Sequence, residues 1–232
     1  MQALKTIAKG LGDVVFPHVC EICGAALPSK SQFICGECIT NRFELARLTR
    51  NPNSEEIILP ENVAVQFALW KFDKGGYLQD LLHSLKYHRL YGIGEDLGKA
   101  LAARVMIFEE FKQRSEMILI PVPLHKMKEK KRGYNQAYYI AKGVGETMSI
   151  PILSRGGLLR VKNTKTQTGF SLEKRKENIS KAFQVHNKSD IKGRICIIVD
   201  DVFTTGATTF ELADELGSAG ASKIMIITVA EA

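Results

Sequence analysis

Short apolar runs alternate with amphipathic segments over most of this chain. Strands are predicted over residues 117–121, 194–199 and 223–229. Continuous apolar runs such as 195–199 and 224–227 are typical of strands buried on both faces of a sheet. Residues 63–70 alternate less strictly and predict another strand, and shorter strands are expected near 157–161 and 182–185. Apolar residues at helical spacing predict helices over 77–87, 94–112, 133–148 and 206–219.

Strands that alternate with helices favour an α/β fold, in which crossover helices flank a mostly parallel twisted sheet. We expect this sheet in a main domain of residues 61–232. Residues 1–60 hold a short amphipathic helix, a cysteine-rich segment and a polar connection that contains prolines. No apolar run approaches the length needed to cross a bilayer, and no signal-peptide core is evident. A cytoplasmic protein is expected.

Four of the five cysteines form two Cys-x-x-Cys pairs near the N-terminus: Cys20 with Cys23, and Cys35 with Cys38. Four thiolates suffice for a closed tetrahedral zinc site, which is structural because no ligand position stays open. Two disulfides, a redox Cys-x-x-Cys and an iron–sulfur site are the alternatives. A cytoplasmic location disfavours structural disulfides, and a redox motif would not need the second pair. We predict a small zinc ribbon.

The most informative stretch follows the apolar run at 195–199. Two acids, Asp200 and Asp201, precede a turn of small and hydroxylated residues that opens a helix, namely Thr204, Thr205, Gly206, Ala207 and Thr208. Backbone amides and hydroxyls at a helix N-terminus bind phosphate. The acids suit vicinal ribose hydroxyls or a hydrated divalent cation. An ordinary N-capped helix is the alternative, but it explains only one threonine.

Basic loops account for part of the net charge of +7. One follows the strand at 117–121 and contains Leu124, His125 and Lys126 at the start of a lysine cluster. The other begins at Arg160 and continues as a long polar segment toward Asn178. Such loops suit a pyrophosphate-bearing substrate, nucleic acid or simply solvent. The second has the length of a lid over an active site, with disorder as the rival interpretation.

The acid–threonine block resembles the phosphoribosyl-pyrophosphate (PRPP) motif of type I phosphoribosyltransferases. Further motifs stand in order along the chain: the two cysteine pairs, Leu81-Leu-His-Ser-Leu-Lys-Tyr87, Pro121-Val-Pro-Leu, Arg132-Gly-Tyr-Asn-Gln-Ala137, Thr164-x-x-Gln-Thr168 and Arg175-x-x-Asn178. Together they resemble the ComF family of bacterial competence proteins, which is linked to DNA uptake and natural transformation. The resemblance covers roughly residues 14–232.

The resemblance implies a type I phosphoribosyltransferase fold that binds PRPP with Mg²⁺. Asp200 and Asp201 would hold the ribose 2′- and 3′-hydroxyls, and residues 204–208 would wrap the 5′-phosphate. The loop of Leu124, His125 and Lys126 would bind pyrophosphate, with Lys126 and Arg160 stabilising its departing charge. Phosphoribosyl transfer to an unidentified acceptor is the leading hypothesis. The alternative is a non-catalytic accessory protein that senses PRPP or binds single-stranded DNA or competence and recombination proteins. A homodimer is a further expectation.

One position departs from the wider pattern. Hypoxanthine–guanine-type enzymes carry an aspartate base where this chain has Thr204. A 6-oxopurine acceptor activated by that aspartate is therefore disfavoured, and the sequence nominates no general base.

Overall fold

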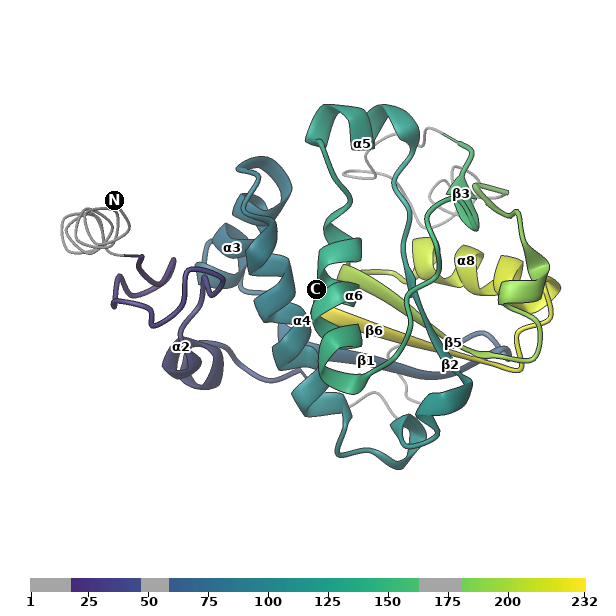
Figure 1. Ribbon diagram of the computed structural model, residues 1–232, viewed down its shortest axis with the longest axis horizontal. Helices are drawn as coiled ribbons and strands as arrows, with labels where there is room; N and C mark the ends of the chain where they lie inside the picture. The colour runs from purple at the N-terminus through teal and green to yellow at the C-terminus, as the bar shows by residue number, and fades with distance from the viewer. Residues whose placement is uncertain (1–17, 47–58, 163–180) are drawn as a thin grey trace, which may run out of the picture.

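A parallel sheet forms the centre of the molecule. The computed structural model describes residues 18–46, 59–162 and 181–232. Its main sheet has the strand order β1 (Val63–Lys71), β6 (Lys223–Glu231), β5 (Ile195–Phe203) and β2 (Met117–Pro121), and every neighbouring pair is parallel (Figure 1). The predicted α/β fold with a mostly parallel sheet is confirmed.

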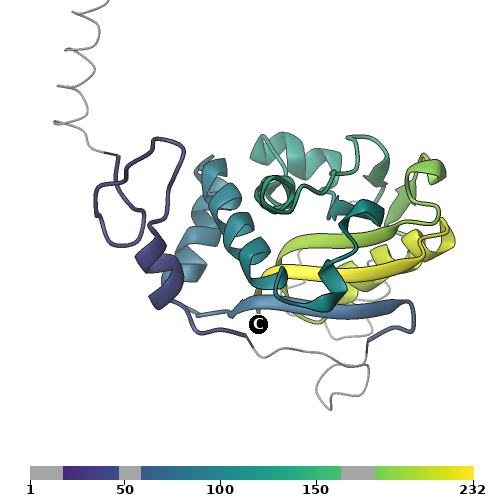
Figure 2. The ribbon, with the colours of Figure 1, turned by 60° about the horizontal axis from the view of Figure 1, so that its bottom comes forward.

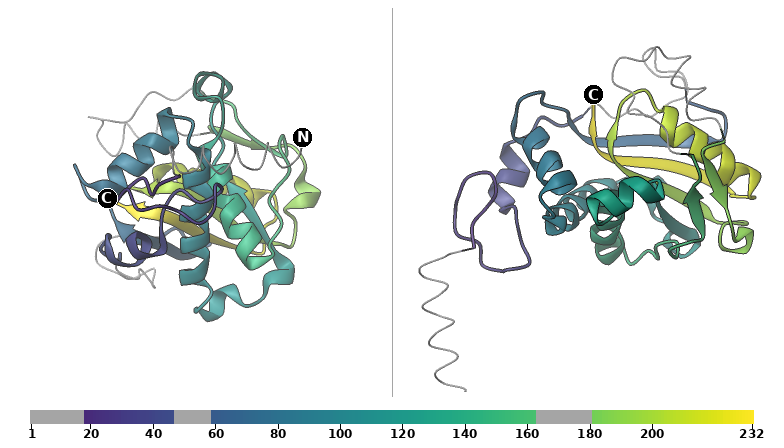
Figure 3. Two further views of the ribbon diagram at one scale, coloured as in Figure 1. Left: turned by 60° about the vertical axis from the view of Figure 1, so that its left-hand side comes forward. Right: turned by 90° about the horizontal axis from the view of Figure 1, so that it is seen from above.

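Helices cover both faces of the sheet, as Figure 2 and Figure 3 show from two sides. Alternate side chains of β5 separate two apolar cores: Ile197 and Val199 face one of them, and Cys196 and Ile198 face the other. The first core is shared with α3 (Tyr77–Tyr87), α4 (Tyr91–Val105) and α6 (Gln136–Met148), and the second with α8 (Ala207–Ser218). Burial on both faces explains the continuous apolar runs of the central strands.

Two glycines allow α4 and α6 to approach closely. A Cβ atom at Gly98 would lie 2.1 Å from the carbonyl oxygen of Ile140, and one at Gly143 would lie 2.1 Å from that of Glu95. Neither position can carry a larger side chain without separating the two helices. This contact fixes α6, and with it Gln136, beside the carboxyl end of β5.

Several boundaries differ from those that the sequence predicts. The helix expected over 94–112 is α4, which ends at Val105 and is followed by the short 3₁₀ helices η1 (Glu109–Phe111) and η2 (Arg114–Glu116). The basic cluster expected as a loop forms α5 (Lys126–Arg132), which ends at Gly133 in a left-handed conformation (φ 91°) before α6 begins. Gly133 therefore divides the helix predicted over 133–148 from a preceding one.

The strands expected near 157–161 and 182–185 also differ in their pairing. They form β3 (Leu158–Arg160) and β4 (Phe183–Val185), an antiparallel pair outside the parallel sheet. The 3₁₀ helix η3 (Lys188–Asp190) follows β4. Three predicted features lie wholly or largely outside the described residues: the N-terminal helix, most of the connection before residue 59, and the lid beyond Lys162.

The cysteine-rich segment packs beside α3 and α4, where Figure 1 draws it in purple. It contains α2 (Gly36–Asn41). Asp96 of α4 is 5% exposed and accepts backbone N–H bonds from Phe33 (2.6 Å) and Ile34 (3.0 Å). A Cβ atom at Gly92 would collide with the Phe33 ring, 2.1 Å away. The segment is thus attached to the rest of the molecule by polar and apolar contacts.

Candidate functional site

The acid–threonine block begins inside β5 rather than after it. Asp200 and Asp201 both lie within the strand, which continues to Phe203 because it pairs with β6 through Val202 and Phe203. The sequence predicted that the strand ends at residue 199, so this boundary prediction is wrong by four residues. Pairing with β6 holds the backbone of both acids in a fixed register.

A small hollow follows the acids. Its volume is about 40 Å³, and it is lined by Asp200 and residues 202–209, including all five predicted turn residues: Thr204, Thr205, Gly206, Ala207 and Thr208. Gly206 is the N-cap of α8 and has φ 74°, and no side chain caps this helix through a hydrogen bond. The Thr205 hydroxyl is buried without a hydrogen-bond partner among the described residues. The hollow therefore offers an uncapped helix start and a free hydroxyl.

The two acids have different surroundings. Asp200 is half-buried and accepts a bond from the Asp201 backbone N–H (2.9 Å). Burial and the adjacent Asp201 charge raise the pKa of Asp200 well above its usual range. Asp201 is 5% exposed, pairs with the Lys86 ammonium of α3, and accepts a bond from Gln136 Nε2 (3.2 Å). Burial would raise the pKa of Asp201, but Lys86, the Asp200 contact and Gln136 together lower it to about 2.

The loop after β2 and the start of the second basic segment lie side by side. A parallel bridge joins His125 to Arg160. His125 Nδ1 accepts the Met127 backbone N–H (3.3 Å) and so caps α5. The Arg160 guanidinium lies over the Phe183 ring, 5.4 Å from its centroid. Burial lowers the pKa of Arg160, an effect that the Asp200 charge opposes.

These residues border a second, larger cavity of about 340 Å³. Leu124, His125, Lys126 and Arg160 all line it, together with Tyr138 and Arg155. Arg155 lies over the Tyr138 ring at 5.1 Å. The structure thus gathers the predicted site residues into two groups, one around each cavity. The two linings share no residue.

Lys86 and Gln136 contact Asp201, and sequence reasoning did not place them in the site. A signal for Lys86 was present, because it continues the spacing of the buried Leu78 and Leu82 on the inner face of α3. Gln136 belongs to the Arg132–Ala137 motif, whose two amides, on Asn135 and Gln136, can each bind a ligand or cap the helix. Asn135 is the cap, since its side chain accepts the Ala137 N–H (3.1 Å).

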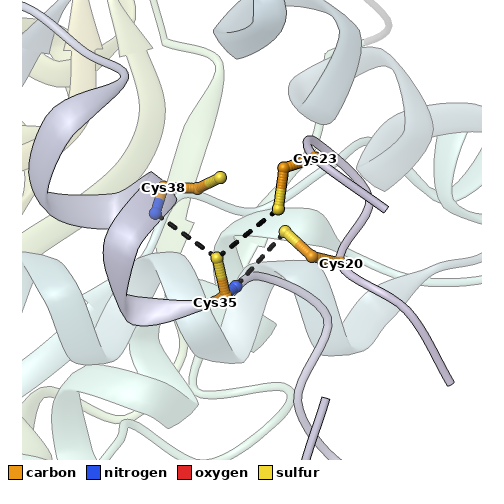
Figure 4. Close-up of side chains that lie close together, drawn as sticks. All are labelled: Cys20, Cys23, Cys35 and Cys38. Atoms are coloured by element: carbon orange, nitrogen blue, oxygen red, sulfur yellow. Dashed lines mark hydrogen bonds between the residues drawn. The ribbon is translucent and has the colours of Figure 1, made fainter. Parts of the chain in front are cut away.

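The four predicted metal ligands converge. The sulfur atoms of Cys20, Cys23, Cys35 and Cys38 all lie within 4.8 Å of one another (Figure 4). The Cys23 and Cys35 sulfurs are 3.8 Å apart, and a tetrahedral site with metal–sulfur bonds of about 2.3 Å requires sulfur separations of about 3.8 Å. The backbone N–H of Cys35 donates to Cys20 Sγ (3.3 Å), and that of Cys38 donates to Cys35 Sγ (3.4 Å). The cluster fits a closed four-thiolate metal site.

No helix within the described residues has both the length and the apolar character needed to cross a membrane.

Known proteins resemble the chain in both sequence and domain type. The phosphoribosyl transferase domain family matches residues 137–232. Competence protein F of Haemophilus influenzae is 28% identical over 222 residues, which cover 94% of this chain and 86% of that protein. DNA utilization protein YhgH of Escherichia coli K12 is 30% identical over 154 residues, which cover 64% of this chain and 65% of that protein.

Two further comparisons are more distant. Competence protein ComFC of Bacillus subtilis is 25% identical, covering 82% of this chain and 68% of that protein. Among solved structures, glutamine PRPP amidotransferase from B. subtilis is 19% identical, with a TM-score of 0.38, and the match covers 58% of this chain and 25% of that one. The sequence matches and the domain type, together with the parallel sheet and the four-cysteine cluster, identify this chain as a member of the ComF family with a phosphoribosyltransferase-like fold.

Proposed function

We propose that the chain binds PRPP together with Mg²⁺ at the carboxyl end of β5. The observation that carries the proposal is the hollow formed by Asp200 and residues 202–209 at the uncapped start of α8. Amide donors at a helix N-terminus favour a dianionic phosphate, because the helix dipole adds to their hydrogen bonds. The buried Thr205 hydroxyl supplies a further donor.

The acid pair suits the rest of the donor. Asp200 lines the hollow, so its carboxyl group can accept ribose hydroxyls or bind a hydrated Mg²⁺ ion. The raised pKa of Asp200 supports this assignment, since a cation or hydroxyl donors would offset the cost of its buried charge. Asp201 is the second acid that we propose for the ribose hydroxyls.

Transfer of the phosphoribosyl group to an acceptor is the reaction that this site would support. Breaking the bond from C1 of the ribose to pyrophosphate passes through an oxocarbenium-like state, and the departing oxygen gains negative charge. Lys126 and Arg160 border the 340 Å³ cavity beside the loop assigned to pyrophosphate, so they are the cations we expect to stabilise it. Thr204 stands where hypoxanthine–guanine-type enzymes carry their base, so the acceptor is proposed to differ from a 6-oxopurine.

Zinc is the metal we propose for the four cysteines. The four sulfurs lie within 4.8 Å of one another, with Cys23 and Cys35 at 3.8 Å, which suits the preference of Zn²⁺ for a closed Cys₄ site. Its role is to hold together residues 18–46. Among the named helices and strands, this segment contains α2 alone.

Single-stranded DNA is a second candidate ligand, favoured by a specific observation. Exposed tyrosines at the two ends of α3 stand next to arginines: Arg42 lies 5.8 Å from the Tyr77 ring centroid and Arg132 lies 5.6 Å from that of Tyr87. Aromatic faces that stack on bases beside cations that bind phosphates are typical of single-strand binders. The names of the relatives, competence protein and DNA utilization protein, agree with a role near DNA.

Calorimetry with PRPP and Mg²⁺ tests the first proposal. Saturable, Mg²⁺-dependent heat is expected from the native chain, and its absence at high PRPP concentration would refute the proposal. Binding of a DNA oligonucleotide as a function of salt tests the second. A steep fall in affinity with salt that survives Asp200→Asn and Asp201→Asn supports a DNA surface separate from the acid pair.

A further inference from the structure

The buried ion pair between Lys86 and Asp201 links α3 to the motif strand. Lys86 lies in the last turn of α3 and 26% of its side chain is exposed, against 7% for Asp201. Its ammonium group bonds one carboxylate oxygen of Asp201, and Gln136 Nε2 donates to the other (3.2 Å). Both oxygens of this acid are therefore engaged by protein groups from two different helices.

A second layer holds these groups in place. Arg132 donates to the side-chain oxygen of Gln136, which turns the amide nitrogen toward Asp201. Tyr134, 7% exposed, donates its hydroxyl to the carbonyl oxygen of Leu85, the residue before Lys86. The segment between α5 and α6 thus fixes the end of α3 at the point from which Lys86 reaches the acid pair.

The neighbouring Asp200 has a different environment. It lines the hollow at the start of α8. The Lys86 charge lowers the pKa of Asp200 against the opposing effects of burial and Asp201, and the Asp200 charge in turn raises the pKa of Arg160 of β3. The positive charge of Arg132 lowers the pKa of Lys86. Lys86 therefore balances the charge of Asp201 within the protein, while Asp200 lines the hollow.

We propose that Lys86 is a positioning residue of the phosphoribosyl site: by pairing with Asp201 it fixes the orientation of the acid pair and leaves Asp200 as the carboxyl group that faces the ligand. This inference rests on the proposed binding of PRPP. It also assigns a task to the Leu81–Tyr87 motif, which belongs to α3 and lies about 115 residues before the acids in the sequence.

Replacement of the ammonium group tests this role. Lys86→Met keeps an unbranched apolar stem and leaves Asp201 with the Gln136 bond but without its cation. The Asp201 carboxylate can then turn, and the adjacent Asp200 no longer meets the ligand in a fixed orientation. We expect Lys86→Met to weaken PRPP–Mg²⁺ binding at least tenfold at pH 7.5.

Two variants serve as controls. Lys86→Arg retains the positive charge and is expected to restore most of the affinity. Lys142→Met removes another half-buried lysine, whose ammonium group bonds Glu95 (2.7 Å) between α6 and α4. It should leave PRPP–Mg²⁺ affinity unchanged, since Lys142 bonds Glu95 rather than the acid pair.

The deciding experiment is titration calorimetry of PRPP with Mg²⁺ into the native chain and the three variants at pH 7.5, each shown to be folded by its circular dichroism spectrum. Weaker binding by Lys86→Met, its recovery in Lys86→Arg and unchanged binding by Lys142→Met support the proposal. Native affinity in folded Lys86→Met would overturn it. An equal loss in Lys142→Met would also overturn it, because removal of any lysine ion pair would then have the same effect. Absence of PRPP binding by the native chain would refute the proposed function instead.

Discussion

Gly206 gives a direct test of how the phosphate turn is built. Its φ of 74° lies in the left-handed region, where an alanine costs on the order of 1 kcal/mol. An added Cβ would also lie 2.4 Å from the Phe210 ring and 2.9 Å from the Phe203 ring. Phe210 is half-buried and can rotate outward, whereas Phe203 is 2% exposed and has no room to move. Overpacking of this kind costs about 1–3 kcal/mol.

Gly193→Ala separates these two contributions. Gly193 has a nearly identical φ of 75°, but no atom lies within 4 Å of the position its Cβ would take. We expect this variant to lose about 1 kcal/mol of unfolding free energy, and Gly206→Ala to lose about 2–4 kcal/mol. Urea denaturation of the native chain and both variants measures the difference, provided that the slopes agree.

The same pair of variants also tests the ligand site. Gly206→Ala displaces the start of α8 and is expected to lower PRPP–Mg²⁺ affinity, while Gly193→Ala is not. Equal losses of unfolding free energy in the two variants would refute the reasoning, because they would show that the aromatic rings yield freely and that only the backbone angle matters.

Three further predictions concern the acids and the cysteine segment. At pH 7.5, Asp200→Asn should raise the melting temperature, and Asp201→Asn should lower it. In the second variant Lys86 lacks its counter-charge, so the free energy of unfolding falls by on the order of 3 kcal/mol; calorimetric melting checks both, and shifts of equal sign would contradict them. Cys35→Ser should lower bound zinc well below one ion per chain and destabilise the protein, whereas Cys196→Ala should retain the metal; elemental analysis decides, and unchanged zinc in Cys35→Ser would rule out the four-thiolate site. Asp96→Ala should free the cysteine segment from α4 without loss of metal, seen as faster amide exchange at residues 33 and 34, and unchanged protection there would count against the anchor.

The acids also predict opposite dependences of stability on pH. Asp200 has a raised pKa in the folded protein, so its contribution favours folding at low pH and is lost as the pH rises from about 4 toward the folded pKa. Asp201 has its pKa lowered to about 2, so its contribution is present above about 4 and is lost as the pH falls toward 2. The free energy of unfolding of the native chain should therefore fall relative to that of Asp200→Asn as the pH rises.

The sequence predicted the central elements well because each has a strong local pattern. The apolar runs identified β2, β5 and β6, and the leucine spacing gave α3 with both boundaries correct. It did not predict the split between α5 and α6, since that depends on the left-handed conformation of Gly133. Nor did it predict the antiparallel pairing of β3 with β4, because short strands carry no information about their partners.

In the candidate site, too, local motifs were predicted and contacts between distant segments were not. Local motifs identified the acid pair, the turn at 204–208 and the four cysteines, since each set of side chains is contiguous or regularly spaced. The environment of the acids could not be inferred in this way. Lys86 and Gln136 reach Asp201 from 115 and 65 positions earlier in the chain, and only the folded arrangement of α3, α6 and β5 brings them together.

Titration calorimetry of PRPP into the native chain and into the double variant Asp200→Asn/Asp201→Asn, each with and without Mg²⁺, tests the central claim most directly. We predict saturable binding by the native chain that requires Mg²⁺ and is abolished in the double variant, with the double variant shown to be folded by its circular dichroism spectrum. No heat from the native chain, or equal binding by the folded double variant, would contradict a phosphoribosyl site at the end of β5.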